Sequence, residues 1–212
     1  MGCHGALNGM HAAYHILNSN SQARVLLCAA ELCSLHMQYG SDAGSAVANA
    51  LFADGAAALI LGGANKSQAT LGAVAEVGSC LVPDSDDAMT WHIGDNGFEM
   101  TLSPSVPGII EKYLPKWMEN WLSQKGLAIS DIKGWAVHPG GPRILDAVET
   151  SLHLPKTALS YSRDILSNYG NMSSPTVLFI LDSLRELCGR IPLPCVILGF
   201  GPGLIVEAVL LN

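Results

Sequence analysis

Charged side chains are scarce in this chain of 212 residues: only 14% are Asp, Glu, Lys or Arg, whereas 49% are hydrophobic. This ratio argues against intrinsic disorder, because disordered chains are rich in charge and poor in apolar residues. Lys and Arg together number 11 against 18 Asp and Glu, so the net charge is -7, and no long basic run occurs. We therefore expect no nucleic-acid partner.

The chain also lacks the patterns of membrane, secreted and zinc-binding proteins. Asp182 interrupts the longest apolar candidate, so we expect neither a membrane span nor a membrane partner. No basic segment followed by an apolar segment opens the chain, and secretion is not indicated. The six cysteines form no CxxC pair, and most lie in apolar runs typical of reduced, buried thiols. These features predict a cytoplasmic protein without disulfides or zinc.

Two side-chain groups have the spacing of metal ligands. His11 and His15 stand four residues apart, as two ligands on one helix face would. No acidic or Cys residue completes the set, and we interpret both histidines as packing or surface residues. Asp84, Asp86 and Asp87 form an acidic group that fits a solvated loop better than a metal cage. We expect no metal ion.

Apolar segments with helical spacing alternate with short, continuously apolar runs. The first pattern predicts helices over 4–18, 43–51, 106–126, 143–154 and 175–187. The second predicts buried strands over 23–33, 51–63, 71–83 and 131–138, and two strands within 194–212. Ser174 and Pro175 fit the cap and first residue of the last helix. A polar turn lies at Tyr39–Asp42 and a weak junction at Gly62–Ser67. The interleaving indicates an α/β fold with a mixed sheet.

Three residues carry side chains that suit acyl transfer. Cys3 precedes a helix, His138 precedes a glycine-rich turn, and Asn171 lies in the turn YGNMSS. Each also has a purely structural interpretation, as a buried thiol, a turn cap or a left-handed turn residue. Taken together, a helix N-terminus makes a thiol more acidic, a neighbouring imidazole activates it, and an amide stabilises an oxyanion. Spacing alone does not show that the three converge.

Five segments resemble, in order, the chalcone and stilbene synthase family of type III polyketide synthases. They are GCHGALNG, ALFADGAAALILG, WAVHPGGPRILDAVE, LSNYGNMSSPTVLFILD and GFGPGLIVEAVLL. The resemblance runs from Cys3 to the last residue. It implies a thiolase-like α-β-α-β-α layered fold. Residues 1–63 would be the remainder of the N-terminal half, beginning at the nucleophile helix, and residues 64–212 the C-terminal half.

The resemblance also implies an activity and its substrates. Cys3 would accept a starter acyl group from an acyl-CoA, and malonyl-CoA would lose carbon dioxide beside His138 and Asn171. The resulting enolate would attack the Cys3 thioester, a decarboxylative Claisen condensation. No cofactor is needed besides the coenzyme A thioesters, which are substrates. Members of the family are homodimers, and we expect a homodimer here.

Pocket residues follow from the same resemblance. Phe52 matches the gatekeeper Phe, and Ser173 matches a Ser that lines the pocket beside the triad. Further substrate-binding positions are Gly140, Gly141, His36, Ala48, Trp91 and Met100. Trp91 replaces a small Gly and Met100 replaces a second gatekeeper Phe of the plant enzymes, so WHIGDNGFEMTLS is more similar to bacterial members.

Two alternatives remain open. A β-ketoacyl-acyl-carrier-protein synthase III has the same fold and the same Cys-His-Asn triad, although the HPGGP, NMSS and GFGPG segments favour the polyketide synthase. The other alternative is a catalytically inactive fragment, because family members carry a substantial segment before the nucleophilic Cys. In such a fragment, strands that should be covered would expose apolar faces.

Overall fold

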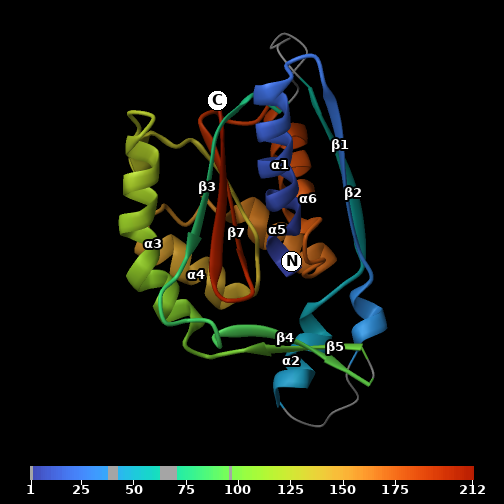
Figure 1. The fold of residues 1–212 in the computed structure, drawn as a ribbon. Coiled ribbons are helices and arrows are strands. Elements are labelled where there is room, and N and C mark those ends of the chain that lie inside the picture. The colour runs from blue at the N-terminus through green and yellow to red at the C-terminus, as the bar shows by residue number, and fades with distance from the viewer. Residues whose placement is uncertain (1, 38–42, 63–70, 96) are drawn as a thin grey trace.

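The computed structural model describes residues 2–37, 43–62, 71–95 and 97–212 (Figure 1). Helices and strands interleave along the chain, as the alternating apolar pattern predicts. The turn expected at Tyr39–Asp42 and the junction expected from residue 63 to residue 67 lie outside the described residues, as does the proposed domain boundary.

A mixed sheet forms the centre of the molecule. Its strands are β3 (Val74–Leu81), β6 (Gly134–Val137), β7 (Cys195–Gly201) and β8 (Ile205–Leu211), in the order β3-β8-β7-β6. β6 and β7 run parallel, whereas β8 is antiparallel to both β3 and β7. All residues of β7 are buried, which explains why its sequence is a continuous apolar run rather than an alternating one.

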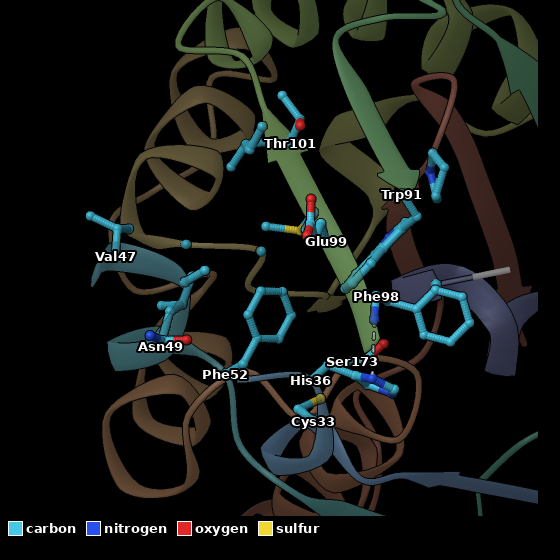
Figure 2. Close-up of a pocket in the computed structure, with 18 of the residues that line it drawn as sticks. Cys33, His36, Val47, Asn49, Phe52, Trp91, Phe98, Glu99, Thr101 and Ser173 are labelled. Carbon is cyan, nitrogen blue, oxygen red and sulfur yellow. Dashed lines mark hydrogen bonds between the residues drawn. The ribbon is translucent and has the colours of Figure 1, made fainter. Parts of the chain in front are cut away.

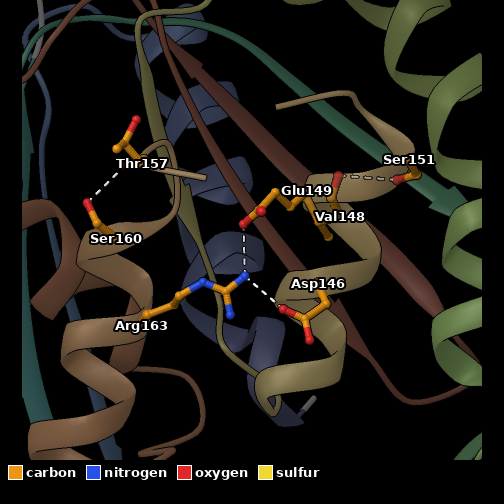
Figure 3. A network of polar contacts seen from close by, with 7 residues as sticks. All are labelled: Asp146, Val148, Glu149, Ser151, Thr157, Ser160 and Arg163. Carbon is orange, nitrogen blue, oxygen red and sulfur yellow. Dashed lines mark hydrogen bonds and ion pairs between the residues drawn. The ribbon is translucent and has the colours of Figure 1, made fainter. Parts of the chain in front are cut away.

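One face of this sheet is covered by α3 (Val106–Ser123) and α4 (Pro142–Ser151) (Figure 1). α3 buries Ile110, Leu114 and Met118 at helical spacing, and it runs through Pro115 as one helix. Figure 3 shows how α4 is tied to α5 (Ser160–Tyr169), an element that the sequence pattern did not predict. There Arg163 donates to Asp146 and to Glu149, each at 2.8 Å.

The other face is covered by α1 (Gly5–Ser19) and α6 (Thr176–Cys188). These helices lie between the central sheet and a two-stranded sheet of β1 (Arg24–Glu31) and β2 (Gly55–Gly62) (Figure 1). α6 begins one residue later than expected: Pro175, not Ser174, is its cap. The Ser174 hydroxyl instead donates to Glu31 at 2.6 Å, because that carboxylate lies beside it at the end of β1.

The β1–β2 sheet has one covered and one exposed face. Leu26 and Ile60 are cross-strand partners, and their side chains are 65% and 70% exposed. The prediction that both strands are buried on two sides is therefore wrong for the described chain. α1 and α6 cover one face only, and no described element covers the other.

A smaller group of elements closes one end of the layers (Figure 1). It consists of the short helix η2 (Cys33–His36), α2 (Ala43–Leu51) and the hairpin β4 (Met89–Gly94) with β5 (Gly97–Leu102). The hairpin, like α5, was not predicted from the sequence. Asp84, Asp86 and Asp87 lie exposed in turns before β4, as a solvated loop should. Within the described ranges, no helix combines the length and apolar character needed to cross a membrane.

Candidate active site

Cys3 lies in a tight turn, η1 (Gly2–His4), that leads directly into α1. Gly2 has a φ of +67°, a conformation that favours glycine, and an added Cβ there would lie 3.1 Å from Pro202 Cδ. The glycine therefore lets this turn approach the loop between β7 and β8. The Cys3 side chain is buried at the N-terminal end of the helix, as the sequence predicts.

Asn171 is fixed by hydrogen bonds of its backbone and of its side-chain oxygen. Its N–H donates to the Leu51 carbonyl at 2.8 Å, and its carbonyl accepts from the Ala53 N–H at 2.9 Å. Its Oδ1 accepts from the Ser173 N–H at 2.9 Å, which closes a turn around Ser173. The Nδ2 group therefore remains as the donor of this amide. The Asn171 and Ser173 side chains both act on the Cys3 thiol and favour a lower pKa for it.

His138 directly follows β6. Its N–H donates to the Leu198 carbonyl at 2.7 Å, and the preceding N–H, of Val137, donates to the buried Ser162 hydroxyl at 3.2 Å. Among the described residues, neither ring nitrogen of His138 has a hydrogen-bond partner. A Cβ built on Gly199 would lie 3.7 Å from His4 Cβ and 3.8 Å from His138 Cβ. His138 and the Cys3 turn therefore flank the same glycine.

Burial controls the charges of this site. It raises the pKa of the Cys3 thiol to about 11; hydrogen bonds from Ser173 and Asn171 oppose the shift, and the Glu31 charge adds to it. Burial, followed by the charge of His4, lowers the pKa of His138 to about 3. The site therefore holds a neutral thiol and a neutral imidazole at neutral pH. The sequence had suggested an acidified thiol, but desolvation outweighs the helix N-terminus here.

A cavity of about 1450 Å³ lies beside Cys3. It is lined by every substrate-binding residue expected from the sequence: His36, Ala48, Phe52, Trp91, Met100, Gly140, Gly141 and Ser173. Gly2 and Gly5, on either side of the Cys3 turn, also line it. Cys3, His138 and Asn171 are not themselves among the lining residues. The cavity reaches the Cys3 turn at Gly2, the turn after His138 at Gly140 and Gly141, and the Asn171 turn at Ser173.

Aromatic rings from separate elements form one side of the cavity (Figure 2). The Trp91 ring makes edge contacts with Phe52 and with Phe98, each with centroids 6.2 Å apart. Phe98 in turn contacts His36 at 4.9 Å, and its N–H donates to His36 Nδ1 at 3.3 Å. This wall connects the β4–β5 hairpin to η2 and to the end of α2. It gives the cavity a wall made mainly of aromatic rings.

Eight polar residues of the cavity were missed by sequence reasoning. They are Glu31, Cys33, Ser34, Asn49, Glu99, Thr101, Ser103 and Arg143. Burial, together with the charges of Glu31 and Cys3, raises the pKa of Cys33 to about 12. Glu31 and Cys33 stand where a strand ends, and that position could have marked them, because strand ends commonly carry functional side chains.

Comparison with known proteins identifies the family. Residues 74–212 match the C-terminal domain of chalcone and stilbene synthases, and residues 1–78 match 3-oxoacyl-[acyl-carrier-protein] synthase III. The chain belongs to the chalcone and stilbene synthase family. It is 36% identical to a 1,3,6,8-tetrahydroxynaphthalene synthase of Streptomyces peucetius subsp. caesius, an alignment that covers 100% of the chain and 57% of that enzyme.

Solved structures agree. The chain superposes on PKS-I of the brown alga Ectocarpus siliculosus with a TM-score of 0.93 and 32% identity, over 100% of this chain and 58% of that one. For the C-terminal type III polyketide synthase domain of Steely1 from Dictyostelium the TM-score is 0.91 at 29% identity, with coverages of 100% and 60%. The predicted thiolase-like α/β fold is confirmed. The family member described here spans less than two thirds of these relatives.

Within the described residues, no group of three or more His, Cys, Asp or Glu side chains is arranged to hold a metal ion. His11 and His15, the pair with ligand spacing, lie on α1 outside the cavity lining. His11 pairs with Glu207, and His15 is exposed.

Proposed function

We propose that this protein is the catalytic part of a type III polyketide synthase, an acyltransferase that extends a Cys3-bound starter acyl group with malonyl-CoA. One observation carries the proposal: in a member of this family, the side chains of Asn171 and Ser173 act on the Cys3 thiol, and Ser173 and Gly2 line a large cavity with an aromatic wall. A large cavity is needed because the acyl chain grows while it remains attached to the thiol.

The first step is the loading of Cys3. The sulfur attacks the carbonyl carbon of an acyl-CoA thioester, the thiol proton passes to the neutral His138 ring, and coenzyme A leaves after receiving a proton. A neutral imidazole suits this step, since it can accept a proton from the thiol. The product is an acyl thioester on Cys3.

The second step is the condensation. The malonyl thioester loses its carboxylate as carbon dioxide, and the electron pair left behind forms an enolate. The Asn171 Nδ2 group and an N–H of neutral His138 would donate to the enolate oxygen. The enolate carbon then attacks the Cys3 thioester, a carbon–carbon bond forms, and the bond from carbon to Cys3 sulfur breaks. Both donors are neutral, so no counter-charge is left buried when the enolate is consumed.

The match of residues 1–78 to 3-oxoacyl-[acyl-carrier-protein] synthase III supports a second candidate. That enzyme would take its malonyl group from an acyl-carrier protein. Parallel assays with malonyl-CoA and with a malonyl-acyl-carrier protein separate the two candidates, because the polyketide synthase turns over the coenzyme A thioester with no carrier protein present.

We also infer a homodimer that works in the cytoplasm on malonyl-CoA and a starter acyl-CoA. Support comes from the family membership and from the free state of all six cysteines, which suits a reducing compartment. Cross-linking and light scattering of the purified protein test the dimer.

The activity test combines substitutions with a malonyl-CoA decarboxylation assay. Cys3→Ala should abolish condensation, and Asn171→Ala or His138→Ala should each lower the decarboxylation rate by about 10²–10³-fold, as expected for a lost oxyanion donor. His15→Ala, an exposed change on α1, is the matched control and should have wild-type rates. Condensation by the Cys3 variant would refute the nucleophile assignment. No turnover by the unsubstituted chain would support the inactive-fragment alternative.

A further inference from the structure

A buried polar cluster lies behind the nucleophile helix, away from the cavity. Glu207 on β8 is only 4% exposed. Its Oε1 accepts from the Ser79 hydroxyl of β3 at 2.8 Å, and its Oε2 lies 3.2 Å from His11 Nδ1 on α1. The opposite nitrogen, His11 Nε2, lies 3.0 Å from the Ala208 carbonyl oxygen. None of these residues lines the cavity, and the proposed reaction uses none of them.

Both ring nitrogens of His11 thus face oxygen atoms. The Ala208 carbonyl can only accept, so Nε2 must carry a proton. The other nitrogen, Nδ1, lies 3.2 Å from Glu207 Oε2, and this buried oxygen has no hydrogen-bond partner among the described residues. The His11 ring is therefore held between the backbone of β8 on one side and the Glu207 carboxylate on the other.

The pair joins the helix that bears Cys3 to the central sheet. His11 lies two helical turns after the Cys3 turn, and Glu207 connects it to β8 and, through Ser79, to β3. A buried charge that loses its partner is costly, so both partners hold α1 in one position. Apolar packing of Leu7 and Met10 against the sheet fixes the depth of the helix, but it is not directional and leaves sliding along the axis less restricted.

Electrostatic contacts extend from this pair toward the reaction centre. The Glu207 charge acts on His4, the residue after Cys3, and opposes the burial that lowers the His4 pKa. His4 is fixed by a 2.6 Å contact between its Nδ1 and Asn8 Oδ1, and the charge of His4 acts in turn on His138. A shift of α1 would therefore reach the Cys3 turn through His4, the residue that joins this turn to the helix.

We propose that the His11–Glu207 pair is a positioning element of the active site, which fixes the nucleophile helix α1, and with it the Cys3 turn, against β8. The importance of this pair for catalysis rests on the proposed role of Cys3 as nucleophile. Whether the pair positions the Cys3 turn is a separate question, because the reactivity of the thiol can be measured without any condensation.

The test is a double-substitution cycle read out at two cysteines. His11→Gln and Glu207→Gln, alone and together, are treated with iodoacetamide, and the alkylation of each cysteine is followed by peptide mass spectrometry. Cys3 reports the nucleophile turn. Cys195, which is fully buried in β7 and outside the cavity lining, reports general loosening of the fold. His15→Gln, the exposed histidine one turn further along α1, is the matched control.

Each single substitution should accelerate the alkylation of Cys3 by about tenfold or more, since the buried Glu207–His11 contact between β8 and α1 is lost, while Cys195 changes less than about twofold. The double variant should resemble either single variant, because the second change removes a partner that is already lost. Equal acceleration at both cysteines, multiplying effects in the double variant, or wild-type rates at Cys3 would each overturn the proposal. A failed condensation assay would leave this result standing, so the two proposals fail separately.

Discussion

The charge state of the Cys3–His138 pair can be decided by titrating the thiol. A thiolate–imidazolium pair would give a reactive thiol at neutral pH. The structure favours the opposite state, because burial raises the pKa of Cys3 to about 11 from 9.0 and lowers that of His138 to about 3 from 6.5. We therefore propose to measure the alkylation rate of Cys3 at a series of pH values from 6 to 10.

The expected magnitude follows from the two pKa values of the thiol. At pH 8 a thiol with a pKa of 9.0 is about one-tenth thiolate, whereas one with a pKa of about 11 is about one-thousandth thiolate. Cys3 should thus react roughly 100-fold more slowly at pH 8 than an ordinary thiol with equal access. Its rate should rise about tenfold with each pH unit up to pH 10, since only the thiolate reacts.

The assay is iodoacetamide alkylation followed by peptide mass spectrometry. The exposed thiol of Cys28 is the internal reference, which shows that the reagent is active at each pH. His138→Gln is the matched variant: it removes the imidazole and should leave the slope unchanged, because a neutral ring contributes no titration. A Cys3 rate that levels off between pH 6 and pH 8, and that loses this plateau in the His138 variant, would refute the neutral pair.

Further predictions concern stability and association. Because the pKa of His138 is lowered in the folded state, only the unfolded chain gains a proton at this residue just below pH 6.5. The free energy of unfolding, measured with urea, should therefore fall by about 2 kcal/mol between pH 6.5 and pH 5. His138→Gln should remove this pH dependence. Ser162→Ala leaves a buried N–H at the end of β6 without its acceptor and should lower the free energy of unfolding by about 1–3 kcal/mol. Ser160→Ala, which removes only an exposed hydrogen bond on the same helix, should lower it by less than about 0.5 kcal/mol. The exposed Leu26 and Ile60 side chains should make the chain self-associate on size-exclusion chromatography. Leu26→Lys with Ile60→Glu, a cross-strand charge pair, should reduce that association, and an unchanged elution profile would contradict this.

Most elements could be predicted because their periodicity is set by contacts within the chain. α2 occupies the residues that the pattern indicated, and β7 and β8 read as apolar runs because both of their faces are covered. The β4–β5 hairpin escaped prediction for a physical reason. Its residues alternate poorly, since Trp91 and Met100 face a cavity rather than a packed core. Patterns that serve a substrate do not follow the period of a sheet.

The site shows the same division. Each expected cavity residue lies on the lining because the ordered motifs fix its position on the fold, as Phe52 and Ser173 illustrate. The charge state of Cys3 and His138 could not be predicted from the sequence motifs. Sequence shows that Cys3 begins a helix, and a helix N-terminus by itself predicts an acidic thiol. It does not show that the Cys3 side chain is buried in the fold, and that burial raises the pKa of the thiol.

The burial that removes charge from the site also suits the proposed chemistry. The Cys3 turn packs against β7, both Cys3 and His138 are buried, and the ionised forms of both are disfavoured. In the proposed reaction, an enolate formed there would meet neutral donors from Asn171 and His138 in a buried environment, where hydrogen bonds are strong. An imidazolium would bind the enolate more tightly but would also protonate it, which would end the reaction at decarboxylation. A neutral imidazole donates without surrendering its proton, so the carbanion remains available for the thioester on Cys3.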